Sequence, residues 1–131
     1  FGQKDYQQAQ VIRRMVRDLN FDLEIVVAPI VREPSGLARS SRNTYLSAEE
    51  KEAALAISQG LKKLKSAAAG EQRRYGLKQL AADITKVGLK VDYVECVDAE
   101  TLEPRKKVEK GCCVLVPAYD GKTRLIDNMV I

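Results

Sequence analysis

The first 31 residues show a helical pattern of apolar positions followed by a β-rich one. Apolar side chains recur at helical spacing over residues 4–19, which predicts a helix that ends at Asn20. The run EIVVAPIV follows at 24–31, and because Pro29 limits strand pairing we expect a buried strand over 24–28. A helix followed at once by a buried strand is typical of a parallel α/β sheet. One helix and one strand cannot make such a sheet, so its other strands are expected to precede this chain.

The middle of the chain predicts a long loop and two further helices. Residues 32–47 have no clean period and are expected to form an ordered loop, which at this length is usually functional. Ser47 and Glu50 have the spacing of a capping box and begin the helical run AEEKEAALAISQGLKKLKSAA. A second amphipathic helix is predicted over 71–87, ending at Gly88. Its inward-facing residues are expected to be Tyr75, Leu77, Leu80, Ile84 and Val87.

The pattern then changes from helical to alternating. KVDYVECVD, CCVLVPAYD and TRLIDNMVI predict three strands, the first two joined by TLEPRKKVEKG and the last two by a hairpin turn at 120–122. Residues 47–131 are therefore expected to be a small α+β domain, with two helices on an antiparallel sheet of about three strands. Residues 1–46 are expected to be the last helix and strand of a separate, preceding domain.

Composition narrows the possible functions. The 131 residues carry a net charge of +4, but basic and acidic residues are interleaved, so an anionic partner is only weakly indicated. The chain has no His, which excludes Ser–His, Cys–His and His-based proton transfer within these residues. Its three Cys lack metal-ligand spacing and are expected to be core residues. The apolar runs are too short to span a bilayer, so we expect no membrane partner and a cytoplasmic location.

Two polar segments are candidates for ligand binding. If a strand ends near Phe1 and a helix begins near Asp5, residues 2–5 form a strand-to-helix turn, where backbone N–H groups are free to meet an anion. Gly2 would allow close approach, Lys4 would add positive charge, and Gln8 lies one turn further on the same side. On spacing alone, a capped and solvated helix start explains these residues slightly better.

The second segment is ARSSRN. Ser40, Ser41 and Arg42 combine two hydroxyls with a planar guanidinium, which suits a polyphosphate, and Arg39 adds a second charge. The competing interpretation is ordinary loop composition. Both segments would flank the predicted strand 24–28 on its ligand side, so together they indicate a nucleotide site more strongly than either does alone.

The motifs FGQKDYQQ, IVREPSGLARSSRNTYLS, VDYVECVDAETLEP and GKTRLIDNMVI resemble, in order and spacing, the second half of the pantothenate synthetase (pantoate–β-alanine ligase) family. The resemblance covers essentially the whole chain. It implies an ATP- and Mg²⁺-dependent ligase that joins pantoate to β-alanine through pantoyl adenylate, releasing pyrophosphate and then AMP. It further implies that 1–46 ends a Rossmann-like ATP- and pantoate-binding domain and that 47–131 is a lid.

The resemblance also implies roles for individual residues. The ATP-binding set is Gly2, Lys4, Asp5, Val31, Ser40, Ser41 and Arg42. Among these, Lys4, Ser40 and Arg42 are expected to be catalytic by stabilising the transition state and the departing pyrophosphate. Gln8 is expected to bind pantoate, and no residue of the chain is assigned to a metal.

Two departures from the family follow from the sequence. Arg39 stands where an apolar residue such as Met or Leu is expected, which puts its contact with the adenine region in doubt. The His-containing phosphate motif of the family's first half is absent, so we expect the 131 residues alone to be inactive. The parent protein is expected to be a homodimer that supplies the missing N-terminal domain.

Two other functions remain open from the sequence. A small basic nucleic-acid-binding module is permitted by the charge, although aromatic residues make up only 5% and no Lys/Arg stripe is present. A purely structural assembly module is also permitted, because the final strand could pair with another chain.

Overall fold

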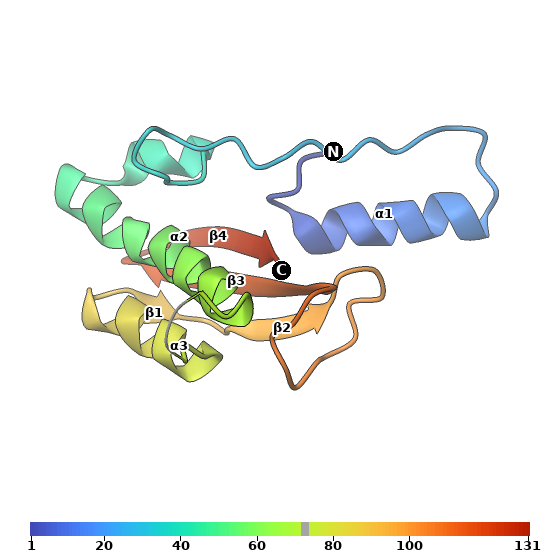
Figure 1. Cartoon of the computed structure of the whole chain (residues 1–131). Coiled ribbons are helices and arrows are strands. Elements are labelled where there is room, and N and C mark those ends of the chain that lie inside the picture. The colour runs from blue at the N-terminus through green and yellow to red at the C-terminus, as the bar shows by residue number, and fades with distance from the viewer. Residues whose placement is uncertain (72–73) are drawn as a thin grey trace.

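Strand β3 (Cys112–Asp120) lies at the centre of a four-stranded antiparallel sheet in the computed structural model, which describes residues 1–71 and 74–131. β4 (Thr123–Val130) pairs with β3 on one side, from Asp120↔Thr123 to Cys113↔Val130. On the other side, β1 (Lys90–Val91) and β2 (Glu95–Asp98) pair with the two ends of β3 in turn. β4 is therefore an edge strand (Figure 1).

The sheet has four strands rather than about three because the predicted strand KVDYVECVD is interrupted. Val91 pairs with Ala118 and Glu95 with Leu115, so three residues oppose two, which is a β-bulge. Pro117 lies at this point, and its carbonyl accepts a hydrogen bond from the Asp92 N–H. Its nitrogen faces the same side and has no hydrogen to donate, so the ladder breaks there. The α+β fold class is otherwise as predicted.

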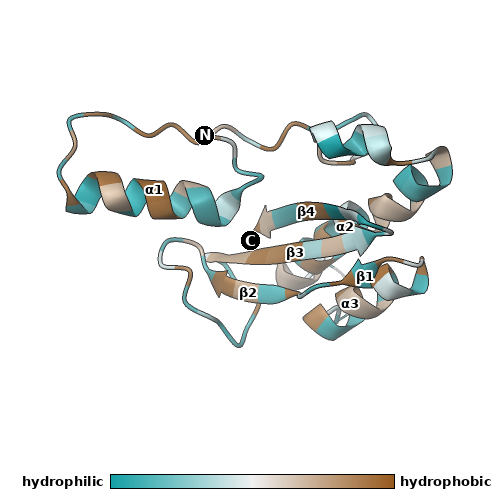
Figure 2. Cartoon of the chain, turned by 180° about the vertical axis from the view of Figure 1, so that it is seen from behind, coloured by the Kyte–Doolittle hydropathy of each residue, from teal (hydrophilic) through white to brown (hydrophobic). Residues whose placement is uncertain are grey.

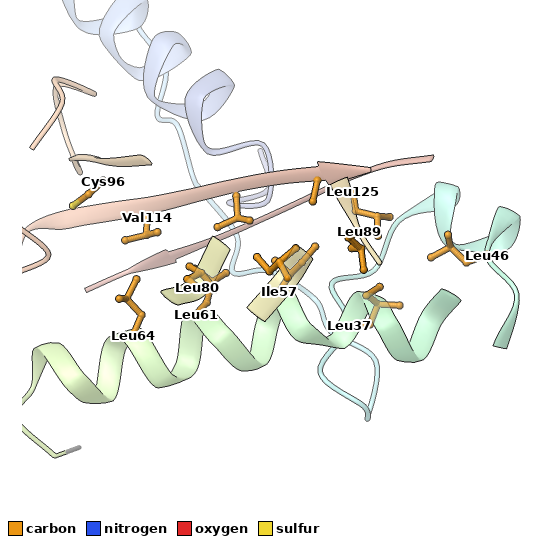
Figure 3. Close-up of a cluster of buried hydrophobic side chains, with 14 of the residues drawn as sticks. Leu37, Leu46, Ile57, Leu61, Leu64, Leu80, Leu89, Cys96, Val114 and Leu125 are labelled. Atoms are coloured by element: carbon orange, nitrogen blue, oxygen red, sulfur yellow. The ribbon is translucent and has the colours of Figure 1, made fainter. Parts of the chain in front are cut away.

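Two helices cover one face of the sheet. α2 (Ala48–Ala68) begins with the predicted capping box: the Ser47 hydroxyl accepts from Glu50 N–H at 3.2 Å, and Ser47 N–H donates to the Glu50 carboxylate at 3.0 Å. Its buried side chains Ile57, Leu61 and Leu64 point toward the strands in Figure 3. α3 (Leu77–Lys86) contributes the fully buried residues Leu80 and Ile84 to the same core.

The predicted second helix over 71–87 is wrong at its first turn. Residues 74–76 are not helical, and α3 begins at Leu77 after the extended Gly76; residues 72–73 of the prediction lie outside the described residues. Tyr75 and Leu77 are partly buried against the core as expected. Val87 is not, because it follows the last helical turn and remains 45% exposed. Gly88, with φ +96°, ends the helix as predicted.

The opposite face of the sheet receives the start of α1 (Tyr6–Asp18). Tyr6 packs with Val97, Cys113 and Leu115, and its hydroxyl donates to the Ala99 carbonyl at 2.6 Å. The remainder of α1 extends beyond the strands, as Figure 2 shows. The helix ends as predicted before Asn20, which has φ 52°.

The prediction of a buried strand over 24–28 is wrong for this structure. The segment is extended, but within residues 1–71 and 74–131 its one β-bridge is the parallel pair Gly2↔Ala28, and Val26 is 67% exposed. Burial of a strand requires neighbours on both edges and cover on both faces, which the described part of the chain does not supply here. Apolar side chains along α1 and this segment are accordingly exposed: Val11, Met15, Leu19, Phe21, Leu23, Val26 and Val31.

Candidate functional site

Residues 2–5, the N-terminal turn, connect the extended strand-like start of the chain to α1. Gln3 N–H donates to the Ala28 carbonyl at 2.8 Å, which fixes the turn on the extended segment. Asp5 occupies the N-cap position of α1, but its carboxylate makes no capping hydrogen bond. The structure therefore does not support the interpretation of Asp5 as a side-chain cap, and leaves its exposed carboxylate available to a ligand.

Lys4 is half-buried, whereas Asp5, the other charged residue of this turn, is exposed. Burial is the main cause that lowers the pKa of Lys4 below the usual value, and the nearby Arg42 cation lowers the pKa further. Asp5 and Asp127 oppose this shift by raising the pKa. Lys4, Ser40 and Asp127 line one small cavity, so three segments far apart in the sequence meet beside Lys4.

Residues 39–42, the hydroxyl segment, lead into the short helix η1 (Ser41–Tyr45). Ser40 caps this helix, since its hydroxyl accepts from Arg42 N–H at 3.2 Å. The Arg42 guanidinium donates to the Arg124 carbonyl on β4 at 3.3 Å. Ser41 and Arg39 are exposed. The segment thus presents a hydroxyl and two cations around an ordered helical turn.

A cleft of about 190 Å³, the β4 cleft, lies between the start of α1 and strand β4. Its polar lining includes Lys4, Asp5 and Gln8 from the N-terminal turn and α1, and Arg124, Asp127 and Asn128 from β4. Tyr93 and Leu115 belong to the rest of the lining. Three of the predicted ligand residues therefore share one polar cleft.

None of the other predicted site residues lines the β4 cleft itself, and Arg42 lines a separate open hollow of about 380 Å³ with Arg124. Lys4 and Ser40 line a small cavity of about 10 Å³, which links the N-terminal turn to the hydroxyl segment. Ser40 and Ser41 line an open hollow of about 490 Å³ together with Arg39. Gly2 and Val31 line none of these four, and Val31 is 63% exposed.

β4 supplies site residues that the sequence analysis missed. The Asp127 carboxylate accepts two hydrogen bonds from Arg32, at 2.7 and 2.8 Å, and its side chain is only 5% exposed. Asn128 is 2% exposed and donates to the carbonyls of Gln3 and Lys4 at 2.9 and 3.1 Å. The available signal was a carboxylate and an amide at consecutive positions inside the apolar run RLIDNMVI.

The charged groups give no dedicated metal site. Across residues 1–71 and 74–131, no group of three His, Cys, Asp or Glu side chains is placed to hold a metal ion. Of the two carboxylates beside Lys4, Asp127 already accepts from both Arg32 nitrogens, which leaves Asp5. These residues do not form a Mg²⁺ site by themselves. Among the helices described, none is both long and apolar enough to cross a bilayer.

Comparison with known proteins identifies the family. The family model described as pantoate-beta-alanine ligase matches residues 1–130. The chain belongs to this family. The pantothenate synthetase of Clostridium novyi (strain NT) is 53% identical over 133 residues, covering 99% of this chain and 47% of the relative. The pantothenate synthetase of Pseudothermotoga lettingae is 51% identical over 136 residues, covering 100% of this chain and 48% of the relative.

Solved structures of the pantoate–β-alanine ligase family agree with this fold. Pantothenate synthetase from Thermus thermophilus superimposes with a TM-score of 0.86 at 40% identity, over 98% of this chain and 48% of that one. The ligase from Francisella tularensis complexed with β-γ ATP and β-alanine gives a TM-score of 0.70 at 32% identity, over 98% and 41% of the two chains. This chain spans about half the length of the curated relatives it matches and corresponds to their C-terminal half.

Proposed function

We propose that this chain supplies the C-terminal half of the active site of an ATP-dependent pantoate–β-alanine ligase. The observation that carries the proposal is the β4 cleft, where Lys4, Asp5 and Gln8 meet polar residues of β4. A relative complexed with β-γ ATP and β-alanine supports nucleotide use by this family. Neither a nucleic-acid-binding nor an assembly function has a comparable observation in its favour.

The reaction we propose has two steps. A carboxylate oxygen of pantoate attacks the α-phosphorus of ATP, the bond from that phosphorus to the bridging oxygen breaks, and pyrophosphate leaves. The amine of β-alanine then attacks the acyl carbon of pantoyl adenylate, loses a proton, and displaces AMP to give pantothenate. Both steps move negative charge onto phosphate oxygens, so their main requirement is fixed positive charge and hydrogen-bond donors.

Lys4, Ser40 and Arg42 meet this requirement. Lys4 and Ser40 line one small cavity, and Arg42 follows Ser40 by two residues, so a hydroxyl and two cationic side chains belong to neighbouring segments. A triphosphate could accept hydrogen bonds from all three. We therefore assign Lys4, Ser40 and Arg42 to stabilising the transition state and the departing pyrophosphate, with Ser41 as a further phosphate donor.

The remaining assignments follow the family resemblance. Gly2 and Asp5 would contact the adenosine, Val31 the adenine, and Gln8 the pantoate. Asp127 is already paired with Arg32, which leaves Asp5 as the one carboxylate beside Lys4 that could take a metal. Because one carboxylate is too few ligands, Mg²⁺ would enter with the nucleotide and be held mainly by phosphate oxygens. We also propose the division into a nucleotide-binding segment, 1–46, and a lid, 47–131, within a homodimeric parent.

The first test is AMP formation by a complete ligase that carries this chain as its C-terminal half. With ATP and Mg²⁺ present, we expect AMP only when both pantoate and β-alanine are added. AMP formation that is independent of both substrates contradicts the proposal. The 131 residues alone are expected to give no turnover, and measurable turnover by them would refute that part.

Arg42→Ala tests the assigned charge. Loss of one fixed donor to a developing anion lowers kcat by about 10²- to 10³-fold. Arg14→Ala is the matched control, because Arg14 is an exposed cation paired with Asp18 one turn along α1. Equal kcat values for the two variants would remove Arg42 from the catalytic set.

A further inference from the structure

β4 contacts the N-terminal turn on one face and the loop that precedes the hydroxyl segment on the other. Successive side chains of a strand point to opposite sides of the sheet. Asp127 pairs across the ladder with Val116, which belongs to the main core between the sheet and helices α2 and α3. Asn128 pairs with Leu115, which belongs to the smaller cluster of buried side chains around Tyr6 on the opposite face. The two polar side chains therefore stand back to back on neighbouring residues, and each faces a different segment.

Asn128 holds the N-terminal turn. Its amide nitrogen donates to the carbonyls of Gln3 and Lys4, and its amide oxygen accepts from the Gln3 side chain at 3.3 Å. Both donors of the amide group and its acceptor are thus used on one turn. Asn128 is almost fully buried, so these hydrogen bonds are made away from water, where loss of a partner is costly.

Asp127 holds the loop that precedes the hydroxyl segment. Its carboxylate pairs with both terminal nitrogens of Arg32, and one of them also donates to the Gly36 carbonyl at 3.0 Å. The Asn128 backbone N–H donates to the same carboxylate at 2.8 Å. Planar two-point pairing fixes direction as well as distance, so the loop has a defined position relative to β4.

β4 is the common support of these two segments. In the described part of the chain, no hydrogen bond joins residues 2–5 directly to residues 39–42. The N-terminal turn bonds to the Asn128 side chain of β4, and the hydroxyl segment bonds to β4 through Arg42 and the Arg124 carbonyl. The loop before the hydroxyl segment bonds to β4 through Arg32 and Asp127. β4 therefore helps to set the separation of Lys4 from Ser40 and Arg42. The extended segment contributes as well, since its Ala28 carbonyl accepts from Gln3 N–H and its Val31 carbonyl accepts from Arg39 N–H.

We propose that Asp127 and Asn128 are positioning residues that hold the N-terminal turn and the hydroxyl segment at the spacing one triphosphate requires. The proposal rests on the proposed ligase function. Neither residue transfers a proton or attacks the substrate. Their contribution is to couple the α+β part of the chain to the nucleotide-binding segments, so that ATP binding depends on two residues in the last strand.

The experiment measures KM for ATP and kcat in the complete ligase carrying Asp127→Asn or Asn128→Asp. Each substitution is nearly isosteric and removes the charge or the two donors that hold one segment. Met129→Ala is the matched control, because Met129 lies next in β4 and its side chain packs against the main core. Arg32→Lys is a second variant that breaks the two-point pair from the loop side and leaves β4 intact.

KM for ATP is expected to rise about tenfold in both β4 variants and in Arg32→Lys, within the range of coupling between linked sites. Amide hydrogen exchange in the 131-residue chain is expected to increase in residues 1–5 for Asn128→Asp and in residues 32–38 for Asp127→Asn. Met129→Ala should lower the melting temperature without changing KM.

Two results would overturn the proposal. One is a KM for ATP in all three variants that stays within twofold of Met129→Ala. The other is unchanged hydrogen exchange in both segments. If the unsubstituted ligase makes no AMP with both substrates present, the proposed function fails, and the positioning role fails with it. This outcome can be told apart from the other two because it is seen before any residue is substituted.

Discussion

Gly60 lies where α2 crosses α3, and its replacement by Ala is expected to destabilise the protein even though Ala favours helices. A Cβ at this position would lie 2.2 Å from Leu80 Cδ1 and 3.3 Å from the Tyr75 hydroxyl oxygen. Leu80 is 0% exposed, so its side chain has no solvent to move into. The contact is far below van der Waals distance and must be relieved by moving Leu80 or separating the helices.

The sign of the change in stability depends on two opposing free energies. Exchanging Gly for Ala inside a helix stabilises by about 1 kcal/mol, whereas forcing one extra methyl into a packed core costs about 1–3 kcal/mol. We therefore expect Gly60→Ala to lower the free energy of unfolding by about 1 kcal/mol net. With a urea m-value of about 2 kcal/mol/M, the midpoint falls by about 0.5 M.

The decisive comparison is the same substitution in a Leu80→Ala background. That change removes the clashing methyl at a cavity cost of about 2–5 kcal/mol, after which Gly60→Ala should stabilise by up to about 1 kcal/mol. Urea unfolding of the four proteins, followed by far-ultraviolet circular dichroism, gives the coupling directly. Gln59→Ala, an exposed neighbour on α2, is the control and should change little. A raised midpoint for Gly60→Ala in the original background would refute the packing argument.

Two further predictions concern Lys4 and the capping box. Folded Lys4 loses its proton at a pH below 10.5, the usual value, so phosphate binding by its ammonium should weaken as pH rises through that lower range. KM for ATP measured from pH 7 to 10 should begin to rise at a lower pH in the unsubstituted ligase than in Lys4→Arg. Coincident pH profiles would show that the charge of Lys4 does not contribute to ATP binding. Ser47→Ala removes an observed N-cap and should cost about 1 kcal/mol, measured as a lower urea midpoint; an unchanged midpoint would show that the cap is not stabilising.

Local sequence features predicted local structure well. The capping box at Ser47 and the helix end at Gly88 each depend on residues within one turn, so their chemistry can be read from spacing. The break in the first β segment could not be read in this way. It depends on which neighbour the Pro117 nitrogen faces, and that orientation is set only when β3 takes its place in the sheet.

The same distinction applies to the candidate site. Lys4, Asp5 and Gln8 lie on one helical start, so their common cleft follows from their spacing. The roles of Asp127 and Asn128 depend on partners 95 and 124 residues away, which no local pattern specifies. The strand at 24–28 was predicted from its β-branched run, but its burial requires neighbouring elements that the described part of the chain does not place around it. Local composition can predict a strand, but it cannot predict which other elements will cover that strand.

Two cationic side chains donate to backbone carbonyls on the outer edge of β4. Arg42 donates to the Arg124 carbonyl at one end, and Lys65 donates to the Val130 carbonyl at 3.0 Å near the other. Free carbonyls along an edge strand are templates for strand addition and aggregation. These two carbonyls already have donors, which reduces what the edge offers to a foreign strand. Removal of Arg42 therefore frees an edge carbonyl for intermolecular pairing, and loss of solubility must be separated from loss of catalysis in that variant.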